Sequence, residues 1–374
     1  MRAGKTFMTA VRCPVNEAAQ ISRDEPALIL DDRKIIYSEV EFYVAGVCAR
    51  LRQAECGAGV RVGLQTGEPW QTALLLMALL RLKAVACLLA GDETDSEKIA
   101  LAKCRLRLGG PGLDAAKLLP VYFEGQDTAE GSMLTLEQPA TILFHADHDG
   151  RFRAILHTYG NHYYGARGAN HAIRLSSGSR WLSSHPLHDA GGLSALFRCL
   201  LSGAALVMPS PGRPLHEVVA RHEITHADLS LEGLEVLLAR GGRERFPALR
   251  AVLVEGGEAY PDLLRKARAA DLPVYPEFGI PEVASGISIV RPGAPPARRN
   301  GAGAPIIYRE VSVNSAGDIL VRGQALFAGY IEPLGLRRPV DNDGWFDTGA
   351  QGRLEGDGEL TVLDPGNHAS SEAD

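Results

Sequence analysis

Apolar runs alternate with helical patterns along the first 290 residues. Short strand-like runs at Ala204–Met208 and Ala251–Val254 are each followed by a stretch with helical spacing, near Leu215–Arg221 and Pro261–Ala270. Strands that alternate with helices in this way are typical of α/β layers built on a parallel sheet. The pattern therefore predicts an α/β fold for this part of the chain.

The pattern changes near residue 291. The segment Arg291–Pro305 is rich in proline and glycine, which interrupt regular structure. Three short alternating runs follow it, EVSVNS, AGDILVRG and GRLEGDGELTVL, and they predict a small β-barrel-like subdomain. We expect a first α/β subdomain in residues 1–140, a second in 141–290, the small β subdomain in 291–364 and a mobile polar tail in 365–374.

Length and composition narrow the class of protein. The chain has 374 residues, 45% of them hydrophobic, which is enough for a large core. A net charge of −6 argues against bulk attraction to nucleic acid, and no apolar run resembles a signal peptide or a membrane span. The six cysteines are scattered and form no C-x-x-C pair, as in reduced cytoplasmic proteins. We expect a cytoplasmic protein that binds neither nucleic acid nor membranes.

The most informative stretch is residues 141–162, TILFHADHDGRFRAILHTYGNH. The β-rich run Thr141–Phe144 enters a loop, and the apolar run Ala154–Leu156 leaves it. A loop that binds phosphates needs small residues, hydroxyl groups and a cation. Here the loop carries Asp147 and Asp149, whose carboxylates would repel a polyphosphate. The outline of the stretch predicts a phosphate site, and its side chains oppose one.

This stretch resembles the phosphate loop of the acyl-CoA synthetases, peptide-synthetase adenylation domains and luciferases, followed by their Q-T-Y-G-N-H segment. Five further segments resemble the large N-terminal domain of that superfamily in the same order: PALILDDRKIIYSEVEFYVAGVCARLRQAECGAGVRVGL, TALLLMALLRLKAVACLLA, HPLHDAGGLSALFRCLLSGAALVM, VYPEFGIPEVAS and DGWFDTGAQGRLEGDGELTVLD. The similarity runs from about Glu25 to Asp364 and is greatest to o-succinylbenzoate–CoA ligase and other aryl-acid CoA ligases. In the first segment, Ser38 and Glu41 have the spacing of a helix capping box.

The resemblance implies a layered αβαβα domain of an adenylate-forming enzyme, but residues that hold the nucleotide in that family are replaced here. Ala350 stands where the family has its ribose-binding aspartate, and Pro281 precedes Glu282, the counterpart of the metal-binding glutamate. The chain ends about ten residues after Asp364, so we expect the small C-terminal domain, with its adenylation lysine, to be absent. These departures predict a degenerate ATP site and no ATP or magnesium cofactor.

The residues of this degenerate nucleotide site are His145, Asp147, His148, Asp149, Gly150, Arg153, Glu282 and Ala350. The histidines and aspartates among them can bind a metal ion, although their spacing singles out none. They can equally fill an empty nucleotide pocket with salt bridges to Arg151 and Arg153, and we favour this second interpretation.

The acyl-binding side is the remaining candidate for chemistry. A helix expected at Gly191–Ser202 carries an apolar stripe for the core and a face of small residues, which serves close packing more often than it makes room for a ligand. By the resemblance, the acyl pocket comprises Gly191, Gly192, Ala195, Arg198, Phe278 and Gly279. Arg198 either pairs with a carboxylate or lies on a solvated face, and we favour the solvated face.

Cys199, His188 and Asp189 are the catalytic candidates. A thiolate at Cys199 can attack a thioester, although most free cysteines are small buried hydrophobes. His188, in a loop flanked by glycine, can act as a general base because its pKa lies near neutrality. Asp189 is adjacent to it, and neighbouring residues rarely form a good hydrogen bond with each other.

Three functions remain open, and the first is the one we favour. It is an acyl or aryl transferase of secondary metabolism that moves an activated, small aromatic acyl group without ATP, between coenzyme A and a thiol acceptor such as an acyl carrier protein. Its cofactor would be a CoA or phosphopantetheine thioester. The second is an ATP-dependent acid–CoA ligase with an altered phosphate loop, which Arg153 and Glu282 favour and Asp147, Asp149 and Ala350 oppose. The third is a non-catalytic relative that binds a partner or a metabolite.

Overall fold

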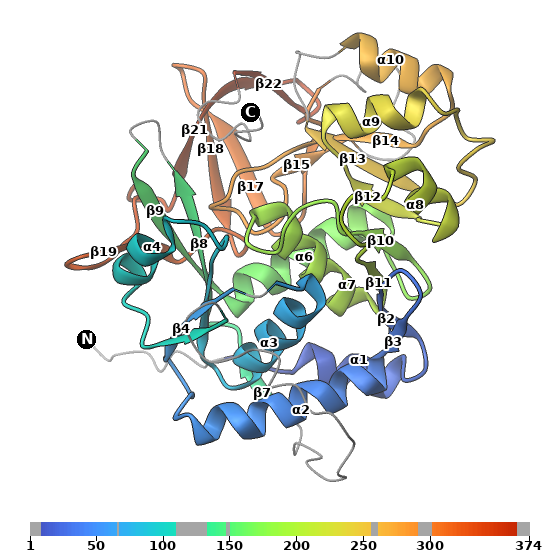
Figure 1. Cartoon of the computed structure of the whole chain (residues 1–374). Helices are drawn as coiled ribbons and strands as arrows, with labels where there is room; N and C mark the ends of the chain where they lie inside the picture. Colours follow the sequence, from blue (N-terminus) through green and yellow to red (C-terminus); the bar gives the residue numbers. More distant parts are fainter. Residues whose placement is uncertain are drawn as a thin grey trace.

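Two large sheets, with helices between and around them, make up most of the molecule (Figure 1). The computed structural model describes residues 9–65, 67–109, 133–146, 150–255, 261–290 and 301–364. None of the helices in these ranges combines the length and the apolar character needed to cross a lipid bilayer. The predicted tail at 365–374 lies outside the described residues. The layered α/β arrangement that the sequence predicts is confirmed.

The first large sheet has seven strands and includes the hairpin of β8 and β9. In spatial order its strands are β20 (Gly335–Arg337), β19 (Gly329–Glu332), β9 (Phe152–Thr158), β8 (Pro139–Ala146), β5 (Val85–Leu88), β4 (Arg61–Leu64) and β6 (Leu106–Leu108). Its centre is parallel, and β8 and β9 are antiparallel. All four residues of β5 are buried, as is typical of a strand covered on both faces.

The second large sheet has nine strands and is parallel from β14 to β2. Its spatial order is β16 (Ala304–Pro305), β15 (Ser288–Ile289), β14 (Val274–Phe278), β13 (Ala251–Glu255), β12 (His226–Asp228), β10 (Arg180–Leu182), β11 (Ala205–Val207), β2 (Pro26–Ile29) and β3 (Lys34–Ile36). Three helices cover its outer face: α8 (Leu215–Arg221), α9 (Leu231–Leu238) and α10 (Pro261–Ala269).

Helices α6 (Tyr159–Ile173) and α7 (Ala190–Ser202) lie in the middle of the molecule, between the two sheets. Glycine lets α6 approach the chain after β14: a Cβ added at Gly165 would lie 2.0 Å from the carbonyl oxygen of Ala284. The remaining helices gather around the strands of the N-terminal part. They are α1 (Pro14–Ile21), α2 (Tyr37–Gln53), α3 (Pro69–Arg81) and α4 (Asp95–Ala102).

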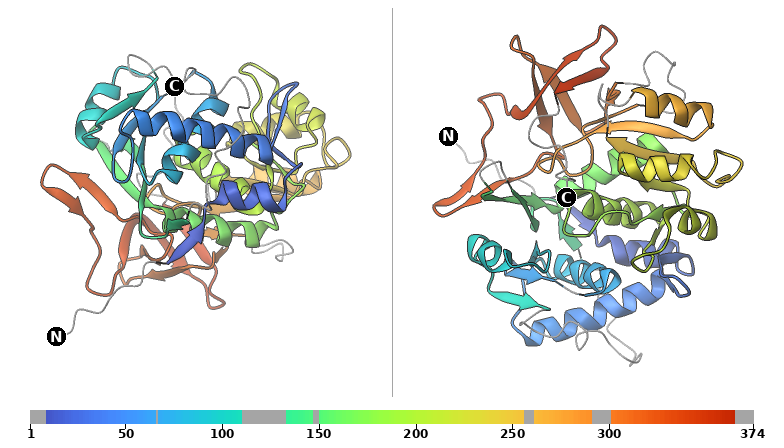
Figure 2. Two further views of the ribbon diagram at one scale, coloured as in Figure 1. Left: turned by 90° about the horizontal axis from the view of Figure 1, so that it is seen from below. Right: turned by 45° about the horizontal axis from the view of Figure 1, so that its top comes forward.

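The predicted small β subdomain forms a four-stranded antiparallel sheet at the edge of the molecule (Figure 2). Its strands are β17 (Arg309–Val313), β18 (Asp318–Gly323), β21 (Phe346–Leu354) and β22 (Leu360–Asp364). A separate antiparallel pair joins β1 (Ala10–Arg12) to β7 (Met133–Thr135). The division into subdomains at residues 140 and 290 stays a prediction. The two large sheets do not follow those boundaries, because β2 and β3 lie in the second sheet while β19 and β20 lie in the first.

The predicted capping box of the first long helix is wrong by two residues. Helix α2 begins at Tyr37, directly after β3, and its N-cap is Ile36, whose backbone N–H donates to Oε2 of Glu39 at 3.0 Å. Ser38 is therefore inside the first turn. Glu41 instead accepts two hydrogen bonds from the guanidinium of Arg81, at 2.9 and 2.5 Å.

Candidate active site

Three residues from distant parts of the chain meet near the start of β9. Arg153 lies on β9, Glu282 follows β14, and Tyr330 lies on β19. The phenol of Tyr330 donates to Oε1 of Glu282 at 2.6 Å, and the guanidinium carbon of Arg153 lies 5.8 Å from the centre of the Tyr330 ring. The antiparallel pairing of β9 and β19, which sets Tyr330 opposite Ile155, brings these side chains together.

The electrostatics of this cluster keep the phenol protonated. Burial, together with the carboxylate of Glu282, raises the pKa of Tyr330 well above its usual range. Tyr330 therefore remains a hydrogen-bond donor to Glu282, which is fully buried. The backbone of Glu282 is fixed as well, since its carbonyl accepts from the N–H of Phe327 at 2.8 Å.

Two buried histidines, His157 and His162, lie next to each other with 5.1 Å between their ring centres, and the sequence analysis did not single them out. Nε2 of His162 lies 2.8 Å from Oγ1 of Thr141, and its ring stacks on Phe197 with 4.2 Å between the ring centres. His157 is fully buried, and burial lowers its pKa to about 4. Both rings are therefore neutral near pH 7 and act as packed supports. The sequence did contain a signal for His157. It directly follows the apolar run Ala154–Leu156, so it continues a strand that is covered in the sheet.

The structure describes part of the predicted degenerate nucleotide site. His145 lies on β8 directly opposite Arg153 of β9, and Gly150 is exposed with a φ of +71°. Ala350, on β21, is fully buried and donates its N–H to Oγ1 of Thr348 at 3.2 Å. The remaining predicted members, Asp147, His148 and Asp149, lie outside the described residues.

The predicted catalytic residues His188 and Asp189 stand at the start of α7 and are both partly exposed. Nε2 of His188 lies 3.6 Å from Oδ1 of Asp189, which is longer than a hydrogen bond. Asp189 is the N-cap residue of α7, but its side chain makes no capping hydrogen bond. The pair is therefore held together by backbone position and not by a mutual hydrogen bond.

The small-residue face of α7 serves close packing. A Cβ added at Gly192 would lie 2.0 Å from the carbonyl oxygen of Pro186, so only glycine lets the chain turn into the helix here. At Gly191 the ring of His185 would lie 3.2 Å away. Ala195 is buried in the core. Of the other predicted acyl-pocket residues, Phe278 is buried and Gly279 is exposed.

Cys199 lies on the core side of α7 and is 2% exposed. Burial raises the pKa of its thiol well above the usual range, so a thiolate is disfavoured. Its backbone carbonyl accepts from the phenol of Tyr37 at 3.2 Å. The side chain has the surroundings of a small core residue.

Arg198 is buried, so the solvated position that we favoured for it is wrong. Its Nη2 lies 3.0 Å from Oε1 of Glu277, its Nε donates to Oγ of Ser285 at 2.8 Å, and its guanidinium carbon lies 5.1 Å from the centre of a Trp181 ring. Arg309, which the sequence analysis did not single out, is buried nearby and donates to the carbonyls of Ala284 and Ser285. The other interpretation, in which Arg198 pairs with a carboxylate, agrees with the structure, and the partner is Glu277.

Comparison with known protein families and structures gives one consistent result. The family model described as AMP-binding enzyme matches residues 110–331. The chain is 26% identical over 370 residues to 2-succinylbenzoate–CoA ligase of Bacillus cereus, covering 93% of this chain and 77% of that protein. It is 28% identical over 373 residues to the enzyme of the same name from Staphylococcus epidermidis, covering 94% and 76%.

Solved structures agree with this result at the level of fold. The unliganded o-succinylbenzoate coenzyme A synthetase of Bacillus subtilis superposes with a TM-score of 0.84 at 22% identity, covering 95% of this chain and 79% of that one. The N-terminal domain of FACL13 from Mycobacterium tuberculosis gives a TM-score of 0.82 at 16% identity, covering 94% and 99%. The match to an isolated N-terminal domain fits the layered fold described above.

These relatives correct two expectations. An ATP-free acyl transferase was the favoured function, but the relatives by sequence are named CoA ligases, and the Bacillus subtilis enzyme has been solved with AMP and with the acyl-adenylate intermediate OSB-AMP. The expectation of no ATP or magnesium is likewise overturned, because the same enzyme has been solved with ATP and magnesium ion. Another structure holds the product analogue OSB-NCoA, which is a coenzyme A partner and not a carrier protein.

Proposed function

Because the chain belongs to the AMP-binding enzyme family, we propose that it is an ATP-dependent acid–CoA ligase with an altered phosphate loop. In this proposal the protein activates a small aromatic carboxylic acid as its acyl adenylate and passes the acyl group to coenzyme A. The names of its sequence relatives, which act on 2-succinylbenzoate, support this class of substrate. Cys199 has no part in the proposed reaction.

The observation that carries the proposal is the cluster of Glu282, Tyr330 and Arg153 near the start of β9. Its residues fit a nucleotide polyphosphate and a divalent cation in kind. A carboxylate is a hard oxygen ligand of the type that magnesium prefers, and a guanidinium matches phosphate geometry. Glu282 is covered and bonded to Tyr330, so cation binding there requires the phenol to move aside.

Magnesium-bound ATP would supply the adenylyl group: a carboxylate oxygen of the acid would bond to the α-phosphorus, and the bond to pyrophosphate, which leaves, would break. In this proposal Arg153 pairs with a phosphate and Glu282 holds the cation. Ala350 cannot accept a hydrogen bond from a ribose hydroxyl, so phosphate contacts and the acid itself carry the binding of the nucleotide. The fixed backbone of Glu282 keeps its carboxylate in place during this exchange.

Exchange of radioactive pyrophosphate into ATP tests the proposal without requiring coenzyme A. The full chain would be assayed with magnesium, ATP and a panel of aryl acids that includes benzoate and 2-succinylbenzoate. We expect acid-dependent exchange with at least one of them, and a tenfold or greater loss of exchange in Arg153→Ala and in Glu282→Gln, since each charged contact contributes roughly 1.5–3 kcal/mol.

A matched control is Arg105→Ala, which removes an exposed arginine that pairs with Glu55 at 2.7 Å. It should leave exchange unchanged. Absence of exchange with every acid, together with no magnesium-dependent ATP binding by calorimetry in a folded protein, would contradict the proposal. Exchange that persists in Arg153→Ala and Glu282→Gln would mean that the nucleotide binds elsewhere than at this cluster.

A further inference from the structure

We propose that a groove at the C-terminal ends of α6 and α7 binds a small organic anion with an apolar body and a hydrogen-bond donor. The groove is a cavity of about 970 Å³ between α6, the end of α7 and the β15–β16 pair. It lies at the end of α7 opposite to Gly191 and Gly192, and none of the six residues of the predicted acyl pocket lines it. The proposal does not depend on the ligase activity.

The charge of the groove is entirely positive. Its three ionisable lining residues, Arg167, His171 and Arg174, lie at spacings of four and three along α6, so they share one face of the helix. Among the described residues, no aspartate or glutamate lines the cavity, although the whole chain has a net charge of −6. In the part of the chain that the structure describes, no ion pair to a carboxylate is found for Arg174. An anion is the charge that complements this face.

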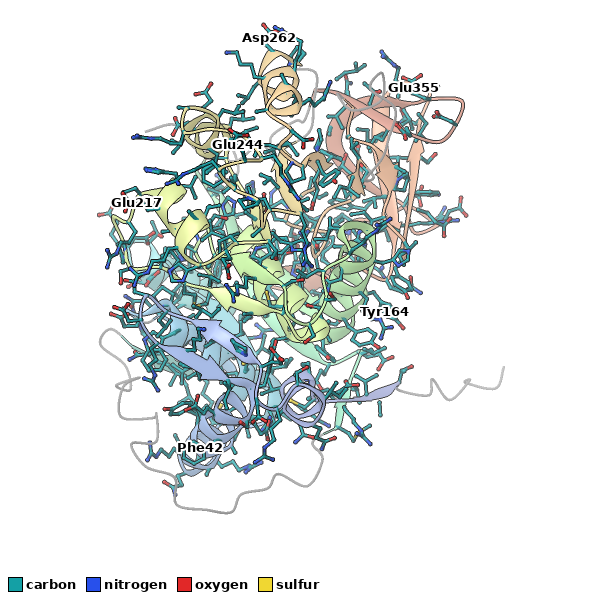
Figure 3. All side chains as sticks on the ribbon, turned by 90° about the vertical axis from the view of Figure 1, so that its right-hand side faces the viewer. Phe42, Tyr164, Glu217, Glu244, Asp262 and Glu355 are labelled. Atoms are coloured by element: carbon teal, nitrogen blue, oxygen red, sulfur yellow. The ribbon has the colours of Figure 1, made fainter. Side chains whose placement is uncertain are left out.

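The acidic side chains labelled in Figure 3 lie away from α6. Figure 3 shows Glu217, Glu244 and Asp262 around the outer helices, and Glu355 on the small sheet, all well apart from Tyr164 of α6. Arg167 is oriented by the same helix, since its Nη1 donates to Oη of Tyr163 at 2.7 Å. Arg167 is therefore held in place, and within the described ranges no ion pair to a carboxylate is found for it either.

The floor of the groove carries an unsatisfied polar group. Asn170 lines the cavity and is 8% exposed. Its Nδ2 donates to the carbonyl of Arg198 at 2.9 Å, but its Oδ1 is buried and accepts no hydrogen bond. Leaving a buried acceptor without a donor costs about 1–3 kcal/mol. Because Oδ1 has almost no accessible surface, an N–H or O–H group of a bound molecule can donate to it only after a small rotation of the Asn170 side chain toward the groove. Basic residues that served only to stabilise the helix terminus would leave this acceptor unexplained.

The walls of the groove are apolar. Leu175, Leu201, Ile289 and Ile306 line it together with Ile307, which keeps 44% of its surface exposed. Gly168 holds this wall close to α6, because a Cβ there would lie 2.7 Å from the carbonyl oxygen of Ile307. The combination of an apolar wall, a cationic rim and a buried acceptor fits an aryl or acyl anion that carries an amide, amine or hydroxyl group.

The fluorescent probe 8-anilino-1-naphthalenesulfonate tests this directly, because it has a sulfonate, an N–H donor and an apolar body. The full chain would be titrated with the probe, and we expect one saturable site. Arg174→Glu and Ile307→Asp should each weaken binding tenfold or more. Both positions keep exposed surface, and an unchanged urea midpoint would show that the variants are folded.

Matched controls replace exposed residues elsewhere: Arg105→Glu for the charge, and Leu334→Asp for the apolar side chain, which is fully exposed. Both should bind the probe like the wild type, and saturating magnesium–ATP should not displace it. Absence of a saturable site, equal affinity in Arg174→Glu and Ile307→Asp, or displacement by ATP would each overturn the proposal.

Discussion

At the scale of single residues, the clearest contrast is between a buried ion pair and an exposed one. The side chain of Arg81 is 1% exposed and that of Glu41 is 19% exposed, with Nη2 and Oε2 2.5 Å apart. Arg105 and Glu55 form a similar pair at 2.7 Å that is mostly exposed. A buried charge that loses its partner is strongly destabilising, whereas an exposed pair contributes little.

We therefore expect Glu41→Ala to lower the free energy of unfolding by about 3–5 kcal/mol, because it leaves the guanidinium of Arg81 buried and without its carboxylate. Glu55→Ala should lower it by less than about 1 kcal/mol. Urea denaturation of the two variants beside the wild type measures both values. Equal losses in the two variants would mean that the Arg81 charge is not desolvated in the folded protein.

Buried histidines predict a loss of stability on mild acidification. Burial lowers the pKa of His157 and of His226 to about 4, from an ordinary value of 6.5. The unfolded chain takes up protons below about pH 6.5 while the folded chain does not, so stability falls between pH 6.5 and pH 4. Each residue contributes on the order of 3 kcal/mol to this fall. The urea midpoint, measured from pH 8 to pH 5, should be flat at first and then drop.

The variant His157→Leu isolates one of these contributions. It should show a smaller drop in urea midpoint between pH 7.5 and pH 5 than the wild type, whatever its stability at pH 7.5. An identical drop would contradict the assignment of the pH dependence to this ring.

Residue-scale prediction from the sequence had mixed success for a physical reason. The family resemblance assigned Glu282 to the nucleotide site, which stays a prediction, while type and spacing put Arg198 on a solvated face and placed the cap at Ser38, both of which are wrong. The carboxylate that covers Arg198 belongs to Glu277, 79 positions away, and no local pattern encodes such a contact. Asp147, His148 and Asp149 stay predictions.

At the scale of elements, glycines in α6 decide how closely the central helix packs. A Cβ at Gly165 would lie 2.0 Å from the carbonyl of Ala284, whereas a Cβ at Gly233 of α9 would meet side-chain atoms at 3.4 Å or more. Both glycines lie inside helices, where alanine is intrinsically favoured by about 1 kcal/mol.

Gly165→Ala should therefore lower the free energy of unfolding by about 1–3 kcal/mol or more, because the added methyl group forces the backbone to shift. Gly233→Ala should leave the free energy of unfolding unchanged or raise it by up to about 1 kcal/mol. Thermal unfolding of the pair gives the comparison. If Gly165→Ala were as stable as Gly233→Ala, the close approach of α6 to Ala284 would not be rigid.

Elements that are compact in sequence were predicted well. The expected helix near Leu215–Arg221 has those bounds, and the run Ala251–Val254 extends by one residue in β13. The short strands β15 and β16 were not predicted, because two residues carry no periodicity and β16 falls in the segment Arg291–Pro305 that reads as a break. Their pairing is set by neighbouring strands of the sheet.

At the scale of the whole molecule, each large sheet takes strands from both ends of the chain. The first sheet contains β4 and β19, and the second contains β2 and β14. The order of the family-like segments along the chain was sufficient to predict the layered fold, because these segments are spread over the whole domain. It was not sufficient to predict the cofactor, because departures at individual positions indicated loss of the nucleotide, whereas a solved relative binds ATP and magnesium ion.

This sheet composition predicts that the fragment 141–290 does not fold alone. It would keep β8 and β9 but lose their neighbours β5 and β19, which leaves two exposed strand edges. We expect no cooperative urea transition and a poorly dispersed amide spectrum, beside a cooperative transition in the full chain. A well-dispersed spectrum of the fragment would instead support the predicted subdomain boundaries.

The pairing of β9 with β19 also matters while the chain is being made. Ile155 leaves the ribosome long before its partner Tyr330, and at 5–20 residues per second the interval is roughly 10–35 s. During that time β9 is an unpaired sheet edge, the kind of surface that associates with other chains. Until β19 is synthesised and pairs with β9, the nascent chain is therefore prone to aggregation. We expect a chaperone, or expression at low temperature, to raise the yield of folded protein by protecting this edge.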